Sequence, residues 1–110
     1  MGANVETRKA DDQGEGANPT FDSNKIYSGN QEGVKCWDGG KGVFKNNMIF
    51  DNAMPNVSCL SGADPTFEGN RIFSGNAGGI QVAEGGMGMF KKNSTYDNAE
   101  FGMKITQTLQ

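Results

Sequence analysis

The sequence predicts an all-β solenoid whose short strands pair in parallel from one coil to the next, and three observations predict it. First, the phrase "NPTFDSNKIYSGN" at Asn18 returns as "DPTFEGNRIFSGN" at Asp64. Second, the chain aligns with itself without gaps at a spacing of 23 residues, which gives four coils, 16–38, 39–61, 62–84 and 85–107. Third, each coil alternates short apolar and polar positions between Gly, Asn and Asp, as strands and turns require.

Residues that share a column of this alignment are expected to lie above one another in neighbouring coils, about 4.8 Å apart. One column is phenylalanine throughout, and isoleucine fills three of the four positions of another. Their members are Phe21, Phe44, Phe67 and Phe90, and Ile26, Ile49 and Ile72. Inward columns of this kind make a narrow, continuous core, so a chain with only 35% hydrophobic residues can still fold.

A column of asparagine follows the phenylalanine column. Its members are Asn24, Asn47, Asn70 and Asn93. Amides that lie one coil apart can donate and accept hydrogen bonds along the solenoid axis and satisfy buried polar groups of the turn. A general preference of asparagine for turns does not explain four copies in strict register, so the sequence predicts an asparagine ladder.

The repeat unit "GANPTFDSNKIYSGNQEGV", which begins at Gly16, resembles a known family. It is similar to the right-handed parallel β-helix repeats of carbohydrate-binding and sugar-hydrolase domains, and to the N-P-T-x-x-x-N-x-I-x-x-G repeats of β-helix F-box substrate adaptors. The resemblance covers residues 16–107 and implies a right-handed parallel β-helix of about four 23-residue coils. It implies little about activity, because such folds include lyases, epimerases, substrate adaptors and plain scaffolds.

The residues outside the four coils are expected to continue the solenoid only in part. Residues 1–15 are expected to hold a partial preceding strand, at Val5 to Arg8, and an exposed polar loop, and residues 108–110 a tail. Neither end shows the polar capping repeat that solenoids usually carry, so open backbone edges are expected there. Such edges indicate a piece of a longer protein or a protein partner that covers the ends, although frayed ends are a third interpretation.

Composition and charge argue against several functional classes. The net charge is −3, and no block of Lys and Arg makes the basic stripe that nucleic-acid binding needs. No run of 18 or more apolar residues is present to span a membrane. The start of the chain lacks the apolar region of a secretory signal, which favours an intracellular or organellar location. Histidine is absent, which argues against Ser-His-Asp and Cys-His catalysis and against most transition-metal sites. No catalytic residue, metal or cofactor is predicted.

The acidic residues favour turns over catalysis. Asp38 and Glu84 share a column two coils apart, or about 9–10 Å, which is near the upper limit for the carboxyl pair of an inverting glycosidase. Ser61 lies between them in the column, and no second acidic column is near, so a solvated turn is the favoured interpretation. Asp51 and Asp97 fall in a D-N-A turn that is repeated in alternate coils.

Another outward column alternates in charge and is predicted to help set the register of the surface. Its members are Asp22, Lys45, Glu68 and Lys91. Opposite charges on adjacent coils stabilise each other by about a few tenths of a kcal/mol per pair.

An aromatic column is the predicted contact surface. It directly follows the isoleucine column and consists of Tyr27, Phe50, Phe73 and Tyr96. Strict alternation would turn these rings outward as a stripe, which could dock a protein or stack on sugar rings. Alternatively, the chain bends here and the rings are partly buried under a corner loop. Trp37 is a further candidate for the contact surface.

Two cysteines lie one coil apart in an inward column that continues with apolar residues. Their Cα separation would permit a disulfide, but parallel side chains make its torsion unfavourable. The sequence therefore predicts that Cys36 and Cys59 are free, buried thiols.

These observations favour a non-enzymatic role. The predicted function is a rigid structural or protein-interaction module, an accessory subunit of a larger assembly or a part of a longer scaffold. One alternative is carbohydrate binding through the aromatic column. A second alternative is a degenerate relative of sugar-active enzymes.

Overall fold

The computed structural model of the chain describes residues 4–7 and 18–106, and these form thirteen strands of three residues each. None of the described residues lies in a helix, so this part of the chain offers no helical membrane span. The strands are β1 (Val5–Thr7), β2 (Thr20–Asp22), β3 (Lys25–Tyr27), β4 (Val34–Cys36), β5 (Val43–Lys45), β6 (Met48–Phe50), β7 (Val57–Cys59), β8 (Thr66–Glu68), β9 (Arg71–Phe73), β10 (Ile80–Val82), β11 (Met89–Lys91), β12 (Ser94–Tyr96) and β13 (Met103–Ile105). The predicted loop after β1 and the predicted tail lie outside the described residues.

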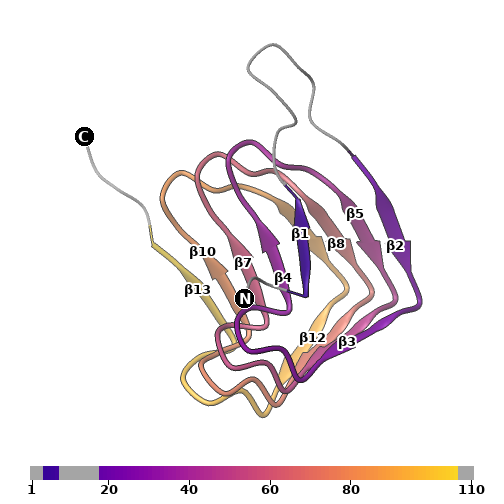
Figure 1. Cartoon of the computed structure of the whole chain (residues 1–110), viewed down its shortest axis with the longest axis vertical. Coiled ribbons are helices and arrows are strands. Elements are labelled where there is room, and N and C mark those ends of the chain that lie inside the picture. Colours follow the sequence, from indigo (N-terminus) through magenta and orange to yellow (C-terminus); the bar gives the residue numbers. More distant parts are fainter. Residues whose placement is uncertain (1–3, 8–17, 107–110) are drawn as a thin grey trace.

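The strands form three parallel sheets that are the three faces of a solenoid (Figure 1). Sheet A has the order β1-β4-β7-β10-β13, sheet B the order β11-β8-β5-β2 and sheet C the order β12-β9-β6-β3. Every coil contributes one strand to each sheet, and in-register partners within the four coils are 23 residues apart, as in the pairing of Phe21 with Phe44. The predicted fold is confirmed: this is a right-handed parallel β-helix of about four coils.

The core is a narrow stack of identical side chains between the three sheets. The four phenylalanines of sheet B stack face to face, with ring centroids 5.0, 4.5 and 5.4 Å apart along the column. Phe44 and Phe67, in the two middle coils, are fully buried, as are Ile49 and Ile72 of sheet C. Burial of a phenylalanine or isoleucine side chain stabilises the fold by about 1.5–3 kcal/mol, so the middle coils contribute most of the apolar stabilisation.

The predicted asparagine ladder lies at the corner between sheets B and C. The backbone N–H of Asn47 donates to Oδ1 of Asn70 over 2.8 Å, and Nδ2 of Asn47 donates to the same atom over 3.1 Å. Asn70 repeats this pattern with Asn93, and its Nδ2 also donates to the carbonyl of Phe44 in the preceding coil. Asn47 and Asn70 are 1% exposed, so the ladder supplies hydrogen-bond partners to polar groups that water does not reach.

A second group of asparagines fills the corner between sheets C and A, and the sequence analysis did not predict it. These corner asparagines are Asn4, Asn52, Asn56 and Asn98. Asn52 and Asn56 are fully buried and joined by a 2.8 Å hydrogen bond, and Nδ2 of Asn56 donates to the carbonyl of Phe73. Asn98 accepts from the backbone N–H of Gly75 and from Nδ2 of Asn56.

The corner asparagines explain why alternate coils are most alike in sequence. Asn52 and Asn98 are replaced by Gly29 and Gly75 in the intervening coils. A Cβ atom at Gly33 would lie 2.5 Å from Nδ2 of Asn52, and one at Gly75 would lie 2.9 Å from Oδ1 of Asn98. The glycine coils therefore leave the space that the asparagines of neighbouring coils occupy, and this alternation produces the 46-residue period.

The remaining corners use turns with positive φ, and this explains the acidic column. Asp38, Ser61 and Glu84 have φ of 52°, 51° and 53°, and the glycine that follows each has φ of 76–79°. Two successive residues with positive φ are characteristic of a type I′ turn. The i to i+3 hydrogen bond of such a turn joins the N–H of Gly40 to the carbonyl of Trp37 over 2.9 Å.

Candidate functional site

The aromatic column lies on the outer face of sheet C, at the C-terminal ends of its strands. Its four rings stack with centroids 5.0, 4.9 and 4.9 Å apart and with interplanar angles of 1–7°. Tyr27 and Tyr96 are 52% and 42% exposed, whereas Phe50 and Phe73 are half-buried. Both open interpretations therefore hold in part: the rings point outward, and the two inner ones are partly covered.

The stacking direction determines which part of each ring a ligand could reach. Each phenylalanine has a neighbouring ring on both faces, so only its edge is free to point outward. Within the stack, only the outer face of Tyr27 and the outer face of Tyr96 are not covered by another ring. The column thus presents a narrow stripe of ring edges with a phenol at each end.

A mixed column of cationic, apolar and polar side chains accompanies the aromatic column on the same face. Their column holds Lys25, Met48, Arg71 and Ser94, which pair in register along sheet C. They precede the aromatic residues by two positions, so both columns point outward while the isoleucines between them are buried. The outer face of sheet C is therefore mixed in character, with Lys25 and Arg71 beside the ring edges.

Trp37 does not join this surface. It follows β4, so it lies at the end of a sheet A strand, whereas Tyr27 ends a strand of sheet C. Its indole Nε1–H donates to the Glu6 carboxylate, and Lys35 Nζ lies 4.8 Å from the centre of its ring. The structure therefore places Trp37 on another face, beside β1, and it is not brought together with the aromatic column.

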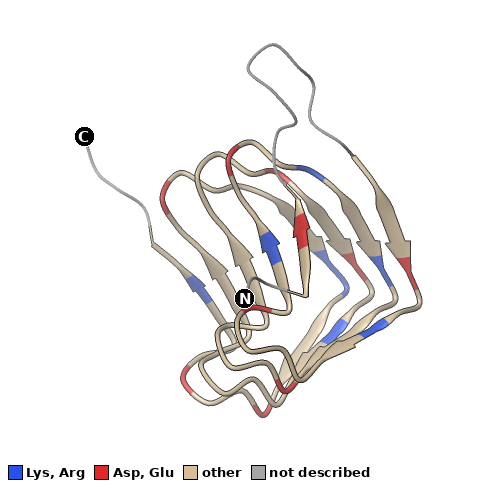
Figure 2. Cartoon of the chain, in the orientation of Figure 1, with Lys and Arg blue, Asp and Glu red and all other residues tan. Residues whose placement is uncertain are grey.

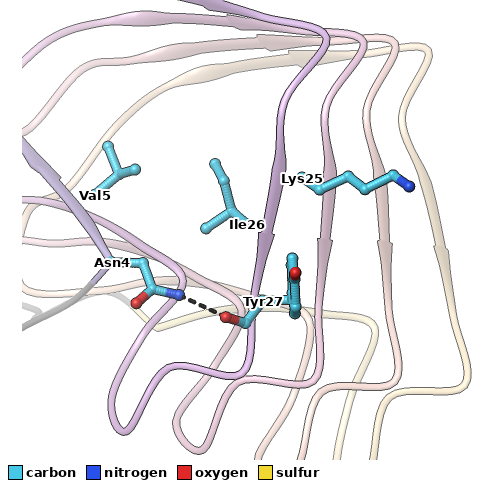
Figure 3. A pocket seen from close by; sticks show the side chains of 5 residues that line it. All are labelled: Asn4, Val5, Lys25, Ile26 and Tyr27. Atoms are coloured by element: carbon cyan, nitrogen blue, oxygen red, sulfur yellow. Dashed lines mark hydrogen bonds between the residues drawn. The ribbon is translucent and has the colours of Figure 1, made fainter.

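A small hollow opens between the β1 segment and β3, next to Tyr27. Asn4, Val5, Lys25, Ile26 and Tyr27 line it, and its volume is about 350 Å³ (Figure 3). The Asn4 amide points across it and donates to the carbonyl of Tyr27 over 3.0 Å. The hollow therefore combines an apolar wall from Val5 and Ile26 with an amide and a phenol at its edge.

The carboxylates that were weighed as a possible pair lie at exposed turns of the solenoid. Asp38 and Glu84 are exposed at the turns, and the described residues contain no cluster of three or more His, Cys, Asp and Glu side chains. The alternating column of sheet B runs from Asp22 to Lys91 along one outer edge (Figure 2). One carboxylate was missed: Glu32 is 6% exposed, and its Oε1 has no hydrogen-bond partner.

The two cysteines are free and fully buried, which confirms the prediction. They are in-register partners on β4 and β7. The hydrogen bond with the Cys36 thiol, together with burial, raises the pKa of the Cys59 thiol far above its ordinary value. The same hydrogen bond lowers the pKa of the Cys36 thiol. Because the thiolate is the reactive form, the Cys59 thiol is suited to packing rather than to nucleophilic chemistry.

The raised pKa of Cys59 predicts that stability falls in alkaline solution. Above the ordinary pKa of 9.0, the unfolded chain releases a proton that the folded chain keeps, so the free energy of unfolding decreases by up to about 1.4 kcal/mol per pH unit. Urea unfolding at several pH values between 8 and 10.5 measures this slope. Cys59→Val is expected to flatten it, and an unchanged slope in that variant would contradict the assignment.

Comparisons with known proteins agree with this geometry. The family model described as the right-handed beta helix region matches residues 6–109. No curated protein and no solved structure matched the chain. The match covers nearly the whole sequence, and a β-helix is the arrangement that the three parallel sheets form. The chain is a member of the right-handed β-helix family.

Proposed function

We propose that the chain is a non-enzymatic structural and protein-interaction module, and that it contacts a protein partner through the outer face of sheet C. The observation that carries this proposal is the column of four stacked rings, with a half-exposed tyrosine at each end. The described residues offer no comparable aromatic surface on sheets A and B, whose outward columns are mainly polar or charged.

Rigidity supports this role. Phe50 and Phe73 are each held between two rings, and their strands, β6 and β9, are paired on both sides. Tyr27 and Tyr96 each stack on one of these fixed rings. Side chains that are already fixed lose little conformational entropy when a partner docks. Tyrosine combines a large apolar body with a polar group at its tip, and it is enriched among the residues that dominate binding energy. The stripe spans about 15 Å on the ordinary strand spacing, which is enough to seat a short strand or loop.

The acidic residues support a role without catalysis. Asp38 and Glu84 are explained by positive-φ turns, and the hydroxyl of Ser61 between them donates weakly to Glu84 over 3.5 Å. Glu32 is buried as a single carboxylate, whereas glycoside hydrolysis ordinarily uses two. These placements offer no acid and base pair across a shared cleft.

Carbohydrate binding is the second candidate, and one observation favours it. A sugar stacks on the face of an aromatic ring, and the outer face of Tyr27 is free of other rings and lies at the hollow lined by Asn4 and Lys25. The phenylalanine faces are covered by their neighbours. The geometry therefore supports one sugar contact at the Tyr27 end rather than a chain of contacts along the column.

The test compares matched surface variants of the whole chain. Tyr27→Ser with Tyr96→Ser alters sheet C, and Lys35→Ser with Lys104→Ser alters sheet A as a control. A partner is isolated by crosslinking, purified and titrated against each variant. The proposal predicts at least about a tenfold loss of affinity, or 1.4 kcal/mol, for the tyrosine pair and little change for the lysine pair. Equal affinities for the wild-type chain and the tyrosine pair would contradict it. Glycan binding that Tyr27→Ser alone abolishes would favour the second candidate.

A further inference from the structure

The two ends of the described solenoid expose complementary strand edges. At one end β1, β2 and β3 have a neighbour on one side only, and at the other end β11, β12 and β13 do. The inward residues of the last coil are left open: Ile105 is 59% and Met103 44% exposed, although their column partners Val82 and Ile80 are buried. Unpaired parallel edges over an apolar interior are templates for a further coil.

Each column of the repeat would continue if the first coil of a second copy followed the last coil of the first copy. The charged column ends in Lys91 and begins with Asp22, so its alternation of sign would persist. In the column at the corner between sheets C and A, the last coil has Asn98 and the first coil has Gly29. Placing Gly29 of the second copy next to Asn98 would continue the alternation of glycine and asparagine seen within the chain. Asn93 would meet Asn24, and Tyr96 would meet Tyr27.

The partial coil at the start prevents this continuation. With β2 of the second copy on β11 and β3 on β12, its β4 would lie next to β13 in sheet A. That place beside β4 is already occupied by β1 of the same copy, through the pairing of Val5 with Val34 and of Thr7 with Cys36. A seamless joint therefore requires β13 of one copy to replace β1 of the next.

The two competing strands differ in what they place against β4. In the inward column, β1 supplies Thr7 and buries its hydroxyl beside Cys36, whereas β13 would supply the aliphatic Ile105. In the outward column, β1 supplies Glu6, which faces Lys35 and accepts from Trp37. There, β13 would supply Lys104, a like charge opposite Lys35. Apolar packing therefore favours the exchange, and charge opposes it.

We propose that β1 prevents a second copy of this chain from pairing with β4. When β1 detaches from β4, copies join head to tail, with β13 of one copy paired to β4 of the next. The occupant of the exposed end is thus the same chain. The joint would cover the outer ring faces of Tyr27 and Tyr96, whereas the ring edges on the outer face of sheet C, where a protein partner is proposed to bind, would stay open. Because the opposing force is electrostatic and exposed, added salt is expected to promote the joint.

The first test weakens the pairing of β1 with β4 in the 110-residue chain. Val5→Pro removes the N–H that donates to the carbonyl of Gly33 over 2.9 Å, and Glu6→Lys removes the attraction to Lys35. Both are expected to raise the association constant at least about tenfold over the wild-type chain. Sedimentation equilibrium is expected to show multiples of the 11.7 kDa monomer. Thr7→Val, which replaces the buried hydroxyl by a methyl group, is expected to lower the association constant.

The second test checks the orientation of the joint by charge reversal in the Val5→Pro background. Lys91→Glu would face Asp22 of the next copy, and Asp22→Lys would face Lys91, so each variant alone is expected to associate several-fold more weakly than Val5→Pro without the reversal. Mixed together, the two variants restore opposite charges at every joint and are expected to associate. Monomers in all mixtures at protein concentrations on the order of 1 mM would overturn the proposal. Association of either reversal variant alone, at the Val5→Pro level, would overturn it as well.

Discussion

Asn70→Ala is expected to lower the free energy of unfolding by about 3–5 kcal/mol. The alanine removes the acceptor of the Asn47 backbone N–H and the donor to the Phe44 carbonyl, and both lost partners lie in the ladder's buried part. A buried polar group without a partner costs about 1–3 kcal/mol, and the ladder's connected hydrogen bonds strengthen one another. Guanidinium chloride unfolding followed by circular dichroism measures the loss.

Asn24→Ala is the matched control for this prediction. Asn24 begins the same ladder, but its side chain is exposed and its backbone N–H still donates to Asn47 in the alanine variant. A change within about 0.5 kcal/mol is expected. Equal losses in the free energy of unfolding for Asn70→Ala and Asn24→Ala would show that the stabilising effect of the ladder does not come from burial.

Phe67→Ala is the second substitution with a large expected effect. Phe67 is fully buried, and its ring lies 4.5 Å from that of Phe44 and 5.4 Å from that of Phe90. Truncation leaves a cavity in the middle of the column, which typically costs about 3–5 kcal/mol. Since a domain of this size is stable by about 5–15 kcal/mol, the variant is expected to be close to unfolded at elevated temperature.

Phe90→Ala is the control, because it removes the same ring from the open end of the column. Phe90 is only partly buried, so its neighbours can expose or rearrange without leaving a closed cavity. Less than half the loss of Phe67→Ala is expected in calorimetry or chemical unfolding. A larger loss at Phe90 than at Phe67 would contradict the assignment of the core to the middle coils.

The sequence alone was sufficient to predict the fold because the same pattern of residue types recurs in all four coils. In this solenoid, side chains 23 residues apart contact each other, so the residue types in a column indicate whether the column is buried or exposed. Phenylalanine and isoleucine columns therefore predicted the core, and the asparagine column predicted the ladder. The free state of Cys36 and Cys59 followed from the geometry of parallel neighbours.

Features that depend on neighbouring coils being different were not predicted. Asn52 and Asn98 were interpreted only as parts of a D-N-A turn, because the glycine coils break their column. Their placement depends on space that Gly33 leaves for Asn52 and Gly75 leaves for Asn98, and this appears only when the coils are placed together. Likewise, alternation predicted outward rings but not which ring faces are covered, and Trp37 was grouped with rings of another sheet.

The geometry of the aromatic column could be predicted only in part from the sequence. Exposure of the rings depends on the path of the chain at the end of sheet C, which spacing in the sequence does not specify. Glu32 lacked any signal, since its column contains Pro55, Gly78 and Phe101 and no second carboxylate.

The fold and both proposed surfaces depend on the stacking of residues 23 apart in adjacent coils, and an X-ray crystal structure tests this stacking most directly. Electron density is expected to show Phe44 and Phe67 face to face with ring centroids about 4.5 Å apart, and the Asn47 backbone N–H within hydrogen-bonding distance of the Asn70 side chain. A structure in which another segment of the chain separates Phe44 from Phe67 would contradict the fold and both proposed surfaces.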